Sequence, residues 1–436
     1  MTGKLIRTFR GVGALAVTAL LATAPAVAQQ AKIKVGNLLD LTGATSSTGK
    51  ISGPGKIDAF NWINANGGIN GKMIEFDSVD YSYKTDRAIQ QYKKWKDDGV
   101  IAIQGYGTND TEAMVGFIAE DKIPYFSMSF SGHLTDPSGD SPRAKAGKVK
   151  PAPYNFFIAA SYSDGNRALL MWAAEDWKKK GGAGKPKYIH MGDNHPYPLA
   201  PKEAGEELAK ELGFDVVPSI QYSLGGGDFK AQCLALQSSG ANYAYLANTT
   251  GANISLVRSC ATVGANVQFM SNVWGMDEAG MKAAGKAVDG LVFVLGQTPW
   301  GGDVPGMKIF RAISNMSDPT GKAYRPMPYA TGACHVLVLA EAMKIADKAG
   351  KLNGPGIKEA LETMKGFVPY ETQGMCAAVT WTATDHRGVD TVTVGRAKVG
   401  GDTETAEVAD LMEKGVMKIE KLADIKVERK PNWQGY

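Results

Sequence analysis

The sequence contains few of the residues from which catalytic and metal sites are usually built. It has five histidines and four cysteines among 436 residues, and the Cys-x-x-Cys, His-Glu-x-x-His and Gly-x-Ser-x-Gly motifs do not occur. His190 and His195 lie five positions apart, a spacing that does not suit a pair of metal ligands on one helix. We therefore expect neither an enzyme nor a protein with a metal or another cofactor.

Long apolar runs and a strong net charge are also lacking. No stretch is long enough to span a bilayer. The first 28 residues have the order of a secretory signal peptide: three basic residues, a short apolar region at 11–24, and Ala-Val-Ala before the cleavage site. Removing them lowers the formal net charge from +4 to +1, which excludes a strongly basic nucleic-acid-binding protein. No cysteine follows the apolar region, so we expect a periplasmic protein that is exported without a lipid anchor.

The four cysteines of an exported chain predict two disulfides. Three pairings are possible. Cys233 and Cys260 lie on two consecutive predicted helices of one βαβα unit, and such helices can lie side by side. We therefore favour the pair Cys233–Cys260, which leaves Cys334–Cys376.

Buried strands alternate with amphipathic helices twice along the chain, which predicts an α/β fold of two Rossmann-like lobes. Each lobe would have a parallel-sheet core, and several crossing segments would form the hinge. We expect residues 29–157 plus 290–385 in lobe 1, and residues 158–289 plus 386–436 in lobe 2. We also expect a surface excursion at 132–153, strand-like pieces at 376–381 and 391–396, and a polar tail after them.

Hydroxyl and amide side chains follow two neighbouring strands predicted in lobe 1. The apolar run 100–104 is followed by Thr108 and Asn109, and the run 123–128 is followed by Ser129 and Ser131. Ligands of open α/β sheets bind at the carboxyl ends of the strands. Helix N-termini at this edge favour anions. These residues therefore predict a small-molecule site at the tips of the first sheet.

The layout resembles the type I periplasmic solute-binding proteins of ABC importers, in the branched-chain (hydrophobic) amino acid and amide family. The likeness covers most of the chain and is carried by residues 33–43 (IKVGNLLDLTG), 63–71 (INANGGING), 106–111, 127–131 and 193–197. The resemblance implies a monomer that closes two lobes on a small molecule. It also implies delivery of that molecule to a permease in the inner membrane.

The resemblance also implies a set of site residues. Thr108, Ser129 and Ser131 would hold a ligand carboxylate, because hydrogen bonds to a charged acceptor are strong even from neutral donors. Thr48 and Tyr197 would line the cleft from opposite lobes. The remaining residues expected at the ligand are Tyr81, Tyr106, Asn109, Phe130, Asn248 and Trp274.

One position departs from the family pattern. The family usually has a carboxylate after the strand expected at 268–272, where it pairs with the ligand's α-ammonium, whereas this chain has Trp274 at or beside that place. Asp277 or Asp193 could substitute. Without such a partner a buried ammonium is poorly compensated. An aromatic carboxylate or an amide is then a candidate beside a hydrophobic amino acid, and a cation over Trp274 is a third.

Two other classes of protein stay open on the sequence alone. A receptor that passes a signal to a membrane protein would have the same ligand-binding face. An exported hydrolase on the same scaffold would need a nucleophile and a base in the cleft, and the sequence shows no such pair.

Overall fold

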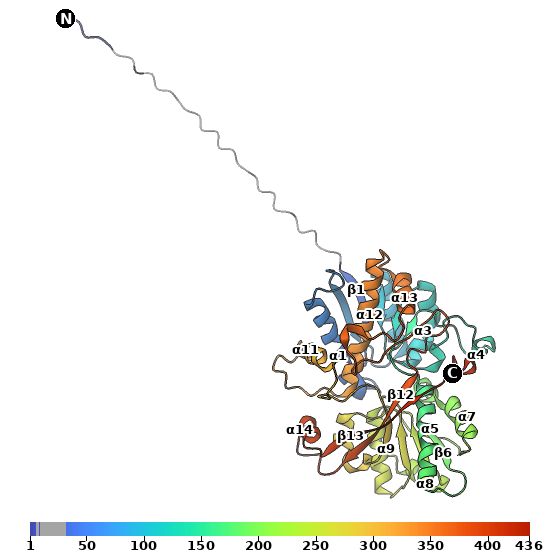
Figure 1. Ribbon diagram of the computed structural model, residues 1–436. Helices are drawn as coiled ribbons and strands as arrows, with labels where there is room; N and C mark the ends of the chain where they lie inside the picture. Colours follow the sequence, from blue (N-terminus) through green and yellow to red (C-terminus); the bar gives the residue numbers. More distant parts are fainter. Residues whose placement is uncertain (6–7, 9–31) are drawn as a thin grey trace. The chain divides into compact units, whose positions relative to one another are not determined.

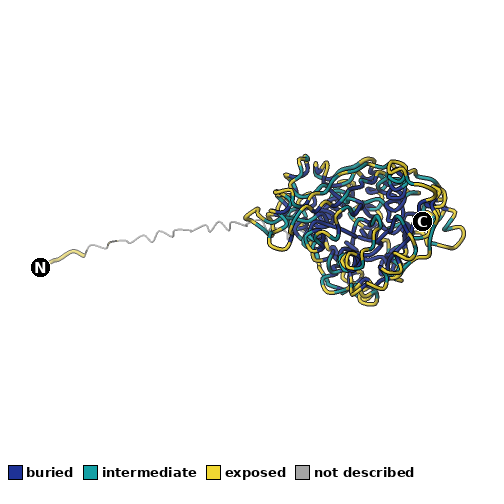
Figure 2. The backbone as a smooth tube through the Cα atoms, turned by 90° about the horizontal axis from the view of Figure 1, so that it is seen from below, coloured by how far each residue is buried: buried dark blue, intermediate teal, exposed yellow. Residues whose placement is uncertain are grey.

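Two sheets form the frame of the protein in a computed structural model that describes residues 1–5, 8 and 32–436 (Figure 1). The signal peptide predicted for residues 1–28 falls almost entirely outside the described residues and stays a prediction. Residues 32–436 form one unit. Buried backbone fills the interior of this unit beneath exposed loops (Figure 2).

The first sheet has five parallel strands in the order β2-β1-β3-β4-β5. They are β1 (Ile33–Leu39), β2 (Ile74–Asp80), β3 (Ala102–Gln104), β4 (Tyr125–Phe126) and β5 (Asn155–Phe156). The helices of this part are α1 (Ser46–Ala65), α2 (Thr85–Asp97), α3 (Thr108–Asp121), α11 (Met307–Ser314), α12 (Met327–Lys348) and α13 (Gly354–Glu362).

Helix α12 is buried along most of its length, as expected for a helix that is apolar on all sides. It packs directly on α1. A Cβ atom on Gly55 would lie 2.0 Å from the Tyr329 carbonyl oxygen, and one on Gly332 would lie 2.2 Å from that of Ser52. The two glycines therefore allow the backbones of α1 and α12 to pack in direct contact.

The second sheet has the order β13-β12-β11-β10-β9-β6-β7, and β8 also pairs with β6. Its strands are β6 (Lys187–Gly192), β7 (Asp215–Val216), β8 (Ile220–Gln221), β9 (Tyr243–Leu246), β10 (Gln268–Ser271), β11 (Val292–Leu295), β12 (Thr391–Val399) and β13 (Met417–Lys426). Around it lie α5 (Tyr162–Lys179), α6 (Pro196–Leu199), α7 (Lys202–Glu211), α8 (Lys230–Ser239), α9 (Thr250–Thr262), α10 (Glu278–Ala284) and α14 (Val408–Glu413). The predicted class, two parallel-sheet lobes, is confirmed, with β12 and β13 added as antiparallel strands.

Three segments cross between the sheets, at about residues 157–161, 296–299 and 387–390. The second crossing was expected near Gly290. Instead, β11 pairs in parallel with β10 and antiparallel with β12, so the chain leaves the second sheet only after Leu295. The apolar run that forms β11 is buried on both faces, as a central strand requires.

Three other expectations about the chain are wrong in part. The polar tail contains the long edge strand β13, whose exposed positions give it a polar sequence. Residues 376–381 form no strand and make only isolated bridges. The excursion 132–153 contains a 3-10 helix, Gly132–Leu134, and α4 (Pro142–Lys145). Asp136 is buried there because its carboxylate accepts hydrogen bonds from the backbone N–H groups of Gly139 and Ser141.

Both predicted disulfides are confirmed. Cys233 on α8 is bonded to Cys260 on α9, and Cys334 on α12 is bonded to Cys376. The bonds link residues that lie 27 and 42 positions apart.

Replacing either cysteine pair by alanines is expected to lower the free energy of unfolding by about 3–4 kcal/mol, because an open chain gains more entropy on unfolding than a cross-linked one. Urea denaturation of the parent, the two double variants and the reduced parent measures this loss. Unchanged midpoints and slopes for both double variants would contradict it.

Candidate ligand-binding cleft

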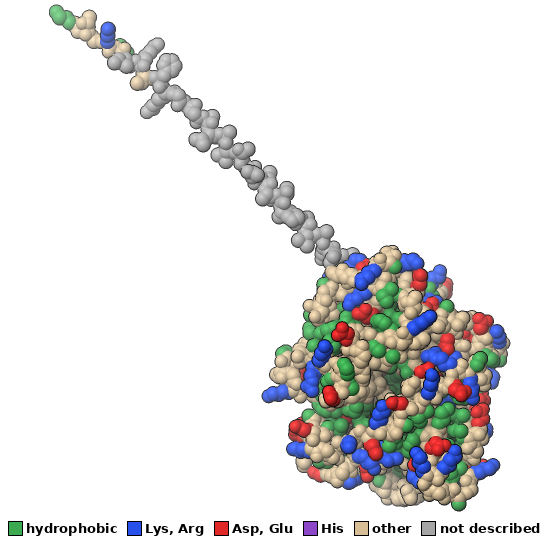
Figure 3. Space-filling model, viewed as in Figure 1, with side chains coloured by type: hydrophobic (Ala, Val, Ile, Leu, Met, Phe, Trp, Pro, Cys, Tyr) green, Lys and Arg blue, Asp and Glu red, His purple; other side chains and the backbone are tan. Residues whose placement is uncertain are grey.

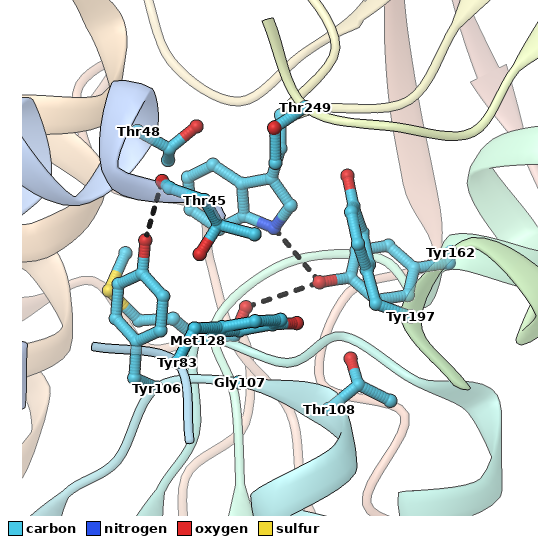
Figure 4. A pocket seen from close by; sticks show the side chains of 11 residues that line it. Thr45, Thr48, Tyr83, Tyr106, Gly107, Thr108, Met128, Tyr162, Tyr197 and Thr249 are labelled. Carbon is cyan, nitrogen blue, oxygen red and sulfur yellow. Dashed lines mark hydrogen bonds between the residues drawn. The ribbon is translucent and has the colours of Figure 1, made fainter. Parts of the chain in front are cut away.

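A small cavity lies between the tips of the two sheets (Figure 4). Its walls come from both lobes and consist of Thr45, Thr48, Tyr83, Tyr106, Gly107, Thr108, Met128, Tyr162, Tyr197, Thr249 and Trp274. Its volume is about 30 Å³, which is room for one or two water molecules. The lobes also touch directly at its edge, where the Gly251 N–H donates to Ser47 Oγ at 3.2 Å and the rings of Tyr83 and His195 lie 5.3 Å apart.

The start of α1 supplies two threonines to the cavity. Buried Asp40 shapes the preceding loop, because its carboxylate accepts hydrogen bonds from the Thr45 N–H at 3.0 Å and the Thr45 hydroxyl at 2.6 Å. Thr48 follows in the first turn of the helix. Its hydroxyl is buried and makes no hydrogen bond with any described residue.

The loop from β3 to α3 forms a second wall. Asp110 holds it, accepting from the Gly107 N–H at 3.2 Å and from the Tyr81 hydroxyl at 2.9 Å. Burial raises the pKa of Asp110 to about 6. The Thr108 hydroxyl is 2.7 Å from that of Ser129, so the ends of β3 and β4 are joined at the cavity, as their parallel pairing allows.

In the second lobe, the side-chain amide of Asn272 at the end of β10 links two residues of the cavity wall. Its Oδ1 accepts from the Trp274 N–H at 2.8 Å and from the Tyr197 hydroxyl at 3.0 Å. The Trp274 indole N–H donates to the Tyr162 hydroxyl at 2.9 Å. Thr249 comes just before α9, and its hydroxyl is buried without a partner among the described residues.

Aromatic rings make up most of the remaining surface. Tyr83 and Tyr106 meet edge to face with centroids 6.2 Å apart, and Tyr162 and Tyr197 do so at 5.3 Å. Burial raises the pKa of Tyr106 and of Tyr162, so their hydroxyls stay neutral at physiological pH. The cavity therefore combines apolar faces with uncharged hydrogen-bonding groups.

No charged side chain lines the cavity in the part of the chain that the structure describes. The two acids that could have replaced the family carboxylate lie elsewhere. Asp193 accepts from the Leu224 N–H at 2.7 Å, and Asp277 caps the N-terminus of α10, where it accepts from the Gly280 N–H at 2.8 Å.

Of the eleven residues predicted at the ligand, five line this cavity: Thr48, Tyr106, Thr108, Tyr197 and Trp274. Two support them from behind. Ser129 hydrogen-bonds to Thr108, and the Phe130 ring packs on Trp274 at a tilt of 31° with centroids 5.0 Å apart.

The other four predicted residues bind to protein groups instead of facing the cavity. Tyr81 donates to Asp110, the Asn109 amide donates to Thr85 at 2.7 Å, and the Ser131 hydroxyl donates to Glu112 at 2.8 Å. The Asn248 amide donates to the Tyr222 carbonyl at 3.0 Å and accepts from the Asp193 N–H at 3.0 Å. Buried loop groups need such partners, and polar side chains near the sheet tips supply them.

Six residues of the cavity were not predicted: Thr45, Tyr83, Gly107, Met128, Tyr162 and Thr249. Thr249 carries a usable signal, since it stands between a buried strand and a helix in the same way as Thr108. Tyr83 has none, because it lies in a turn with φ 56° and reaches the cavity only through tertiary packing.

Comparison with known proteins agrees with this architecture. Residues 32–403 match the model of a family described as periplasmic binding protein. The chain belongs to the periplasmic binding protein family. No curated protein sequence matches it.

Several solved structures share the fold of this periplasmic binding protein. An ABC transporter substrate-binding protein from Aeropyrum pernix is 24% identical, with a TM-score of 0.75 and coverage of 92% of this chain and 98% of that one. A branched-chain amino acid ABC transporter protein from Thermus thermophilus, with bound valine, is 18% identical, with a TM-score of 0.74 and coverage of 92% and 97%. A fatty acid ABC transporter substrate-binding protein from Thermomonospora curvata is 18% identical, with a TM-score of 0.73 and coverage of 93% and 95%.

Two further findings on the periplasmic binding protein, about membrane-spanning helices and metal sites, apply to the described residues 1–5, 8 and 32–436. No helix there has both the length and the apolar character needed to cross a membrane. The same residues contain no group of three or more histidine, cysteine or acidic side chains that could hold a metal ion.

Proposed function

We propose that this protein is the periplasmic, ligand-binding component of an ABC importer. It binds one small carboxylate-bearing solute with an apolar or aromatic body, closes about its hinge, and presents the solute to a permease in the inner membrane. In this proposal the chain is a monomer without catalytic activity.

The observation that carries the proposal is a pair of unpartnered hydroxyls on opposite lobes. Thr48 Oγ1 and Thr249 Oγ1 are both buried and both line the cavity, and neither has a hydrogen-bond partner among the described residues. A buried polar group without a partner costs free energy. The cavity is too small for such a solute in this structure, so the lobes must part to admit it. A ligand that accepts from both hydroxyls then removes this cost and links the two lobes, so its binding favours closure upon it.

The surroundings of these hydroxyls favour an anion. The helices α1, α3 and α9 all begin at the cavity, and helix N-termini attract negative charge. No acidic side chain lines the cavity to compensate an ammonium group. We therefore place an aromatic or aliphatic carboxylate ahead of a free amino acid, with the tyrosine and tryptophan rings burying its body.

Matched pairs of small molecules test the ligand class. We expect 3-phenylpropanoate to raise the melting temperature more than phenylalanine does, and 4-methylpentanoate more than leucine, because each amino acid adds an ammonium that the cleft does not compensate. Benzoate against benzamide separates an anion from an amide. A larger shift with either amino acid than with its partner would contradict the anion assignment, and no shift with any compound would contradict the proposal for this class of solute.

The threonine hydroxyls are tested by substitution. Thr48→Val and Thr249→Val keep the side-chain shape and remove the hydroxyl, and each is expected to weaken binding of the best compound about 5- to 150-fold, equivalent to roughly 1–3 kcal/mol. Calorimetric titration measures the affinity. Thr262→Val is the matched control, because Thr262 is exposed at the other end of α9. Equal affinity in all three variants would show that the hydroxyls do not contact the ligand.

A further inference from the structure

A second and larger cavity lies at the hinge, outside the ligand-binding cleft. Its volume is about 520 Å³, and Tyr162 is the one lining residue that it shares with the cleft cavity. Figure 3 shows hydrophobic side chains around a hollow between the two lobes, on the face where Figure 1 places β12 and β13. Cavities of this size between lobes are typical of small-molecule sites.

The walls of this hinge cavity combine apolar side chains with polar ones, and several of the polar groups are paired with protein groups. The Thr298 hydroxyl donates to the Gly374 carbonyl at 2.7 Å. Lys421 and the Thr393 hydroxyl both bind Asp424, at 2.6 Å and 2.7 Å. The Asp390 carboxylate accepts from the Thr391 hydroxyl at 3.1 Å and lies 3.9 Å from the Arg429 guanidinium. Both charged side chains of the wall, Lys421 and Asp390, therefore have a protein partner of opposite charge, which favours an uncharged ligand.

The hinge cavity is built so that its shape depends on the hinge angle. All three crossing segments line it, through Ala159, Gln297 and Asp390 among others. In this structure the hinge cavity is wide while the cleft cavity measures only about 30 Å³. A molecule that fits the hinge cavity at this angle stabilises this arrangement of the lobes over one with a wider cleft.

We propose that the hinge cavity binds a compact, uncharged apolar molecule and that its occupation favours the closed cleft. The site is separate from the proposed carboxylate site and would couple to it through the hinge. The proposal does not depend on which solute the cleft binds.

Binding is tested with the uncharged fluorescent dye N-phenyl-1-naphthylamine. We expect saturable binding of one dye per chain, weakened at least tenfold by Ala378→Trp and by Thr391→Trp, which place an indole in the hinge cavity from two exposed wall positions. Thr262→Trp adds an indole at an exposed position that lines neither cavity and is expected to leave the dye affinity unchanged. Non-saturable binding, or binding weakened as much by Thr262→Trp as by the two wall variants, would overturn the proposed site.

Coupling to the cleft is tested by alkylation. In the Thr249→Cys variant, iodoacetamide reaches the new thiol only when the lobes part, so saturating dye is expected to slow its alkylation several-fold. In the Thr262→Cys variant the thiol is exposed on the same helix, and its rate is expected to stay the same. Equal rates with and without bound dye in the Thr249→Cys variant would overturn the coupling.

Discussion

The Lys56→Met variant is expected to gain roughly 3 kcal/mol more stability over the parent at pH 6 than at pH 9.5. Lys56 lies on α1 and is fully buried. Its ammonium donates to the carbonyl oxygens of Gly105 at 2.8 Å and Leu38 at 3.3 Å. No carboxylate forms an ion pair with it in the described part of the chain. Burial therefore lowers the pKa of Lys56 to about 7, although Asp110 opposes this shift.

The sign follows from the protons bound in each state. Between about pH 7 and the ordinary lysine pKa, the unfolded chain holds a proton on this residue that the folded chain lacks, so the stability of the parent rises with pH. Below pH 7 both states are charged, and the folded state carries the full cost of burying the ammonium. Methionine has no such cost, so its advantage is largest below pH 7 and shrinks as the pH rises.

Urea denaturation of parent and variant at the two pH values measures this difference. Losing the two hydrogen bonds to Leu38 and Gly105 costs the variant about 1–3 kcal/mol. This loss is nearly the same at both pH values, so the informative quantity is the change in ΔΔG between them. Lys50→Met is the matched control, since Lys50 is exposed on the same helix. An identical ΔΔG at both pH values for Lys56→Met would show that its ammonium is not held in a charge-excluding site.

Lys56 also bears on the proposed ligand. Its ammonium lies 5.8 Å from the centroid of the Tyr106 ring, and Tyr106 lines the cleft. A carboxylate bound there favours the charged form of Lys56. The same residue that lowers stability at neutral pH would thus strengthen the attraction of the first lobe for an anion.

The parts of the cleft that sequence reasoning found are those with a local signal. Thr48 and Thr108 stand where a buried strand ends and a helix begins, and the topology of parallel sheets brings such places together. The disulfide Cys233–Cys260 was predictable for a similar reason, because its two helices are consecutive in one βαβα unit. Family resemblance added Tyr197 and Trp274, which pattern alone would not single out.

The parts that were missed depend on tertiary packing. Tyr83 projects from a turn with positive φ, and Tyr162 begins the helix that follows a crossing segment. Asn248 is predicted at the ligand, but its amide donates to the Tyr222 carbonyl and accepts from the Asp193 N–H. The sequence of strand β13 is typical of a polar tail because Met417 is the only buried residue of this edge strand. Neither periodicity nor composition predicts which polar side chains will hydrogen-bond to the backbone of neighbouring loops and which will face the cavity.

The Glu278→Gln variant is expected to be about 3 kcal/mol more stable than the parent at pH 8.5, and to differ from it by less than about 1 kcal/mol at pH 5. Glu278 is the first residue of α10 and is fully buried. Burial, with a smaller contribution from Asp277, raises its pKa to about 7. Its carboxylate accepts hydrogen bonds from the Met327 N–H at 2.9 Å and the Tyr324 hydroxyl at 3.3 Å.

The direction is opposite to that for Lys56. Between the ordinary glutamate pKa and about pH 7 the folded state holds a proton that the unfolded state has released, so the parent loses stability as the pH rises. Glutamine stays neutral and keeps an oxygen that can accept from Met327. The variant therefore avoids this loss of stability, and it becomes more stable than the parent only as the pH rises toward and above 7.

This carboxylate joins the two lobes, because α10 lies beside the second sheet and Met327 begins α12, which packs on α1 of the first lobe. Chemical denaturation at pH 5 and pH 8.5 measures the stability gain, with Glu404→Gln as the control at an exposed glutamate. If Glu278→Gln is less stable than the parent at pH 8.5, the charged carboxylate at the start of α12 must stabilise the folded state by more than its burial destabilises it. The link between the lobes would then be an electrostatic one that strengthens with pH, rather than a neutral hydrogen bond that weakens with it.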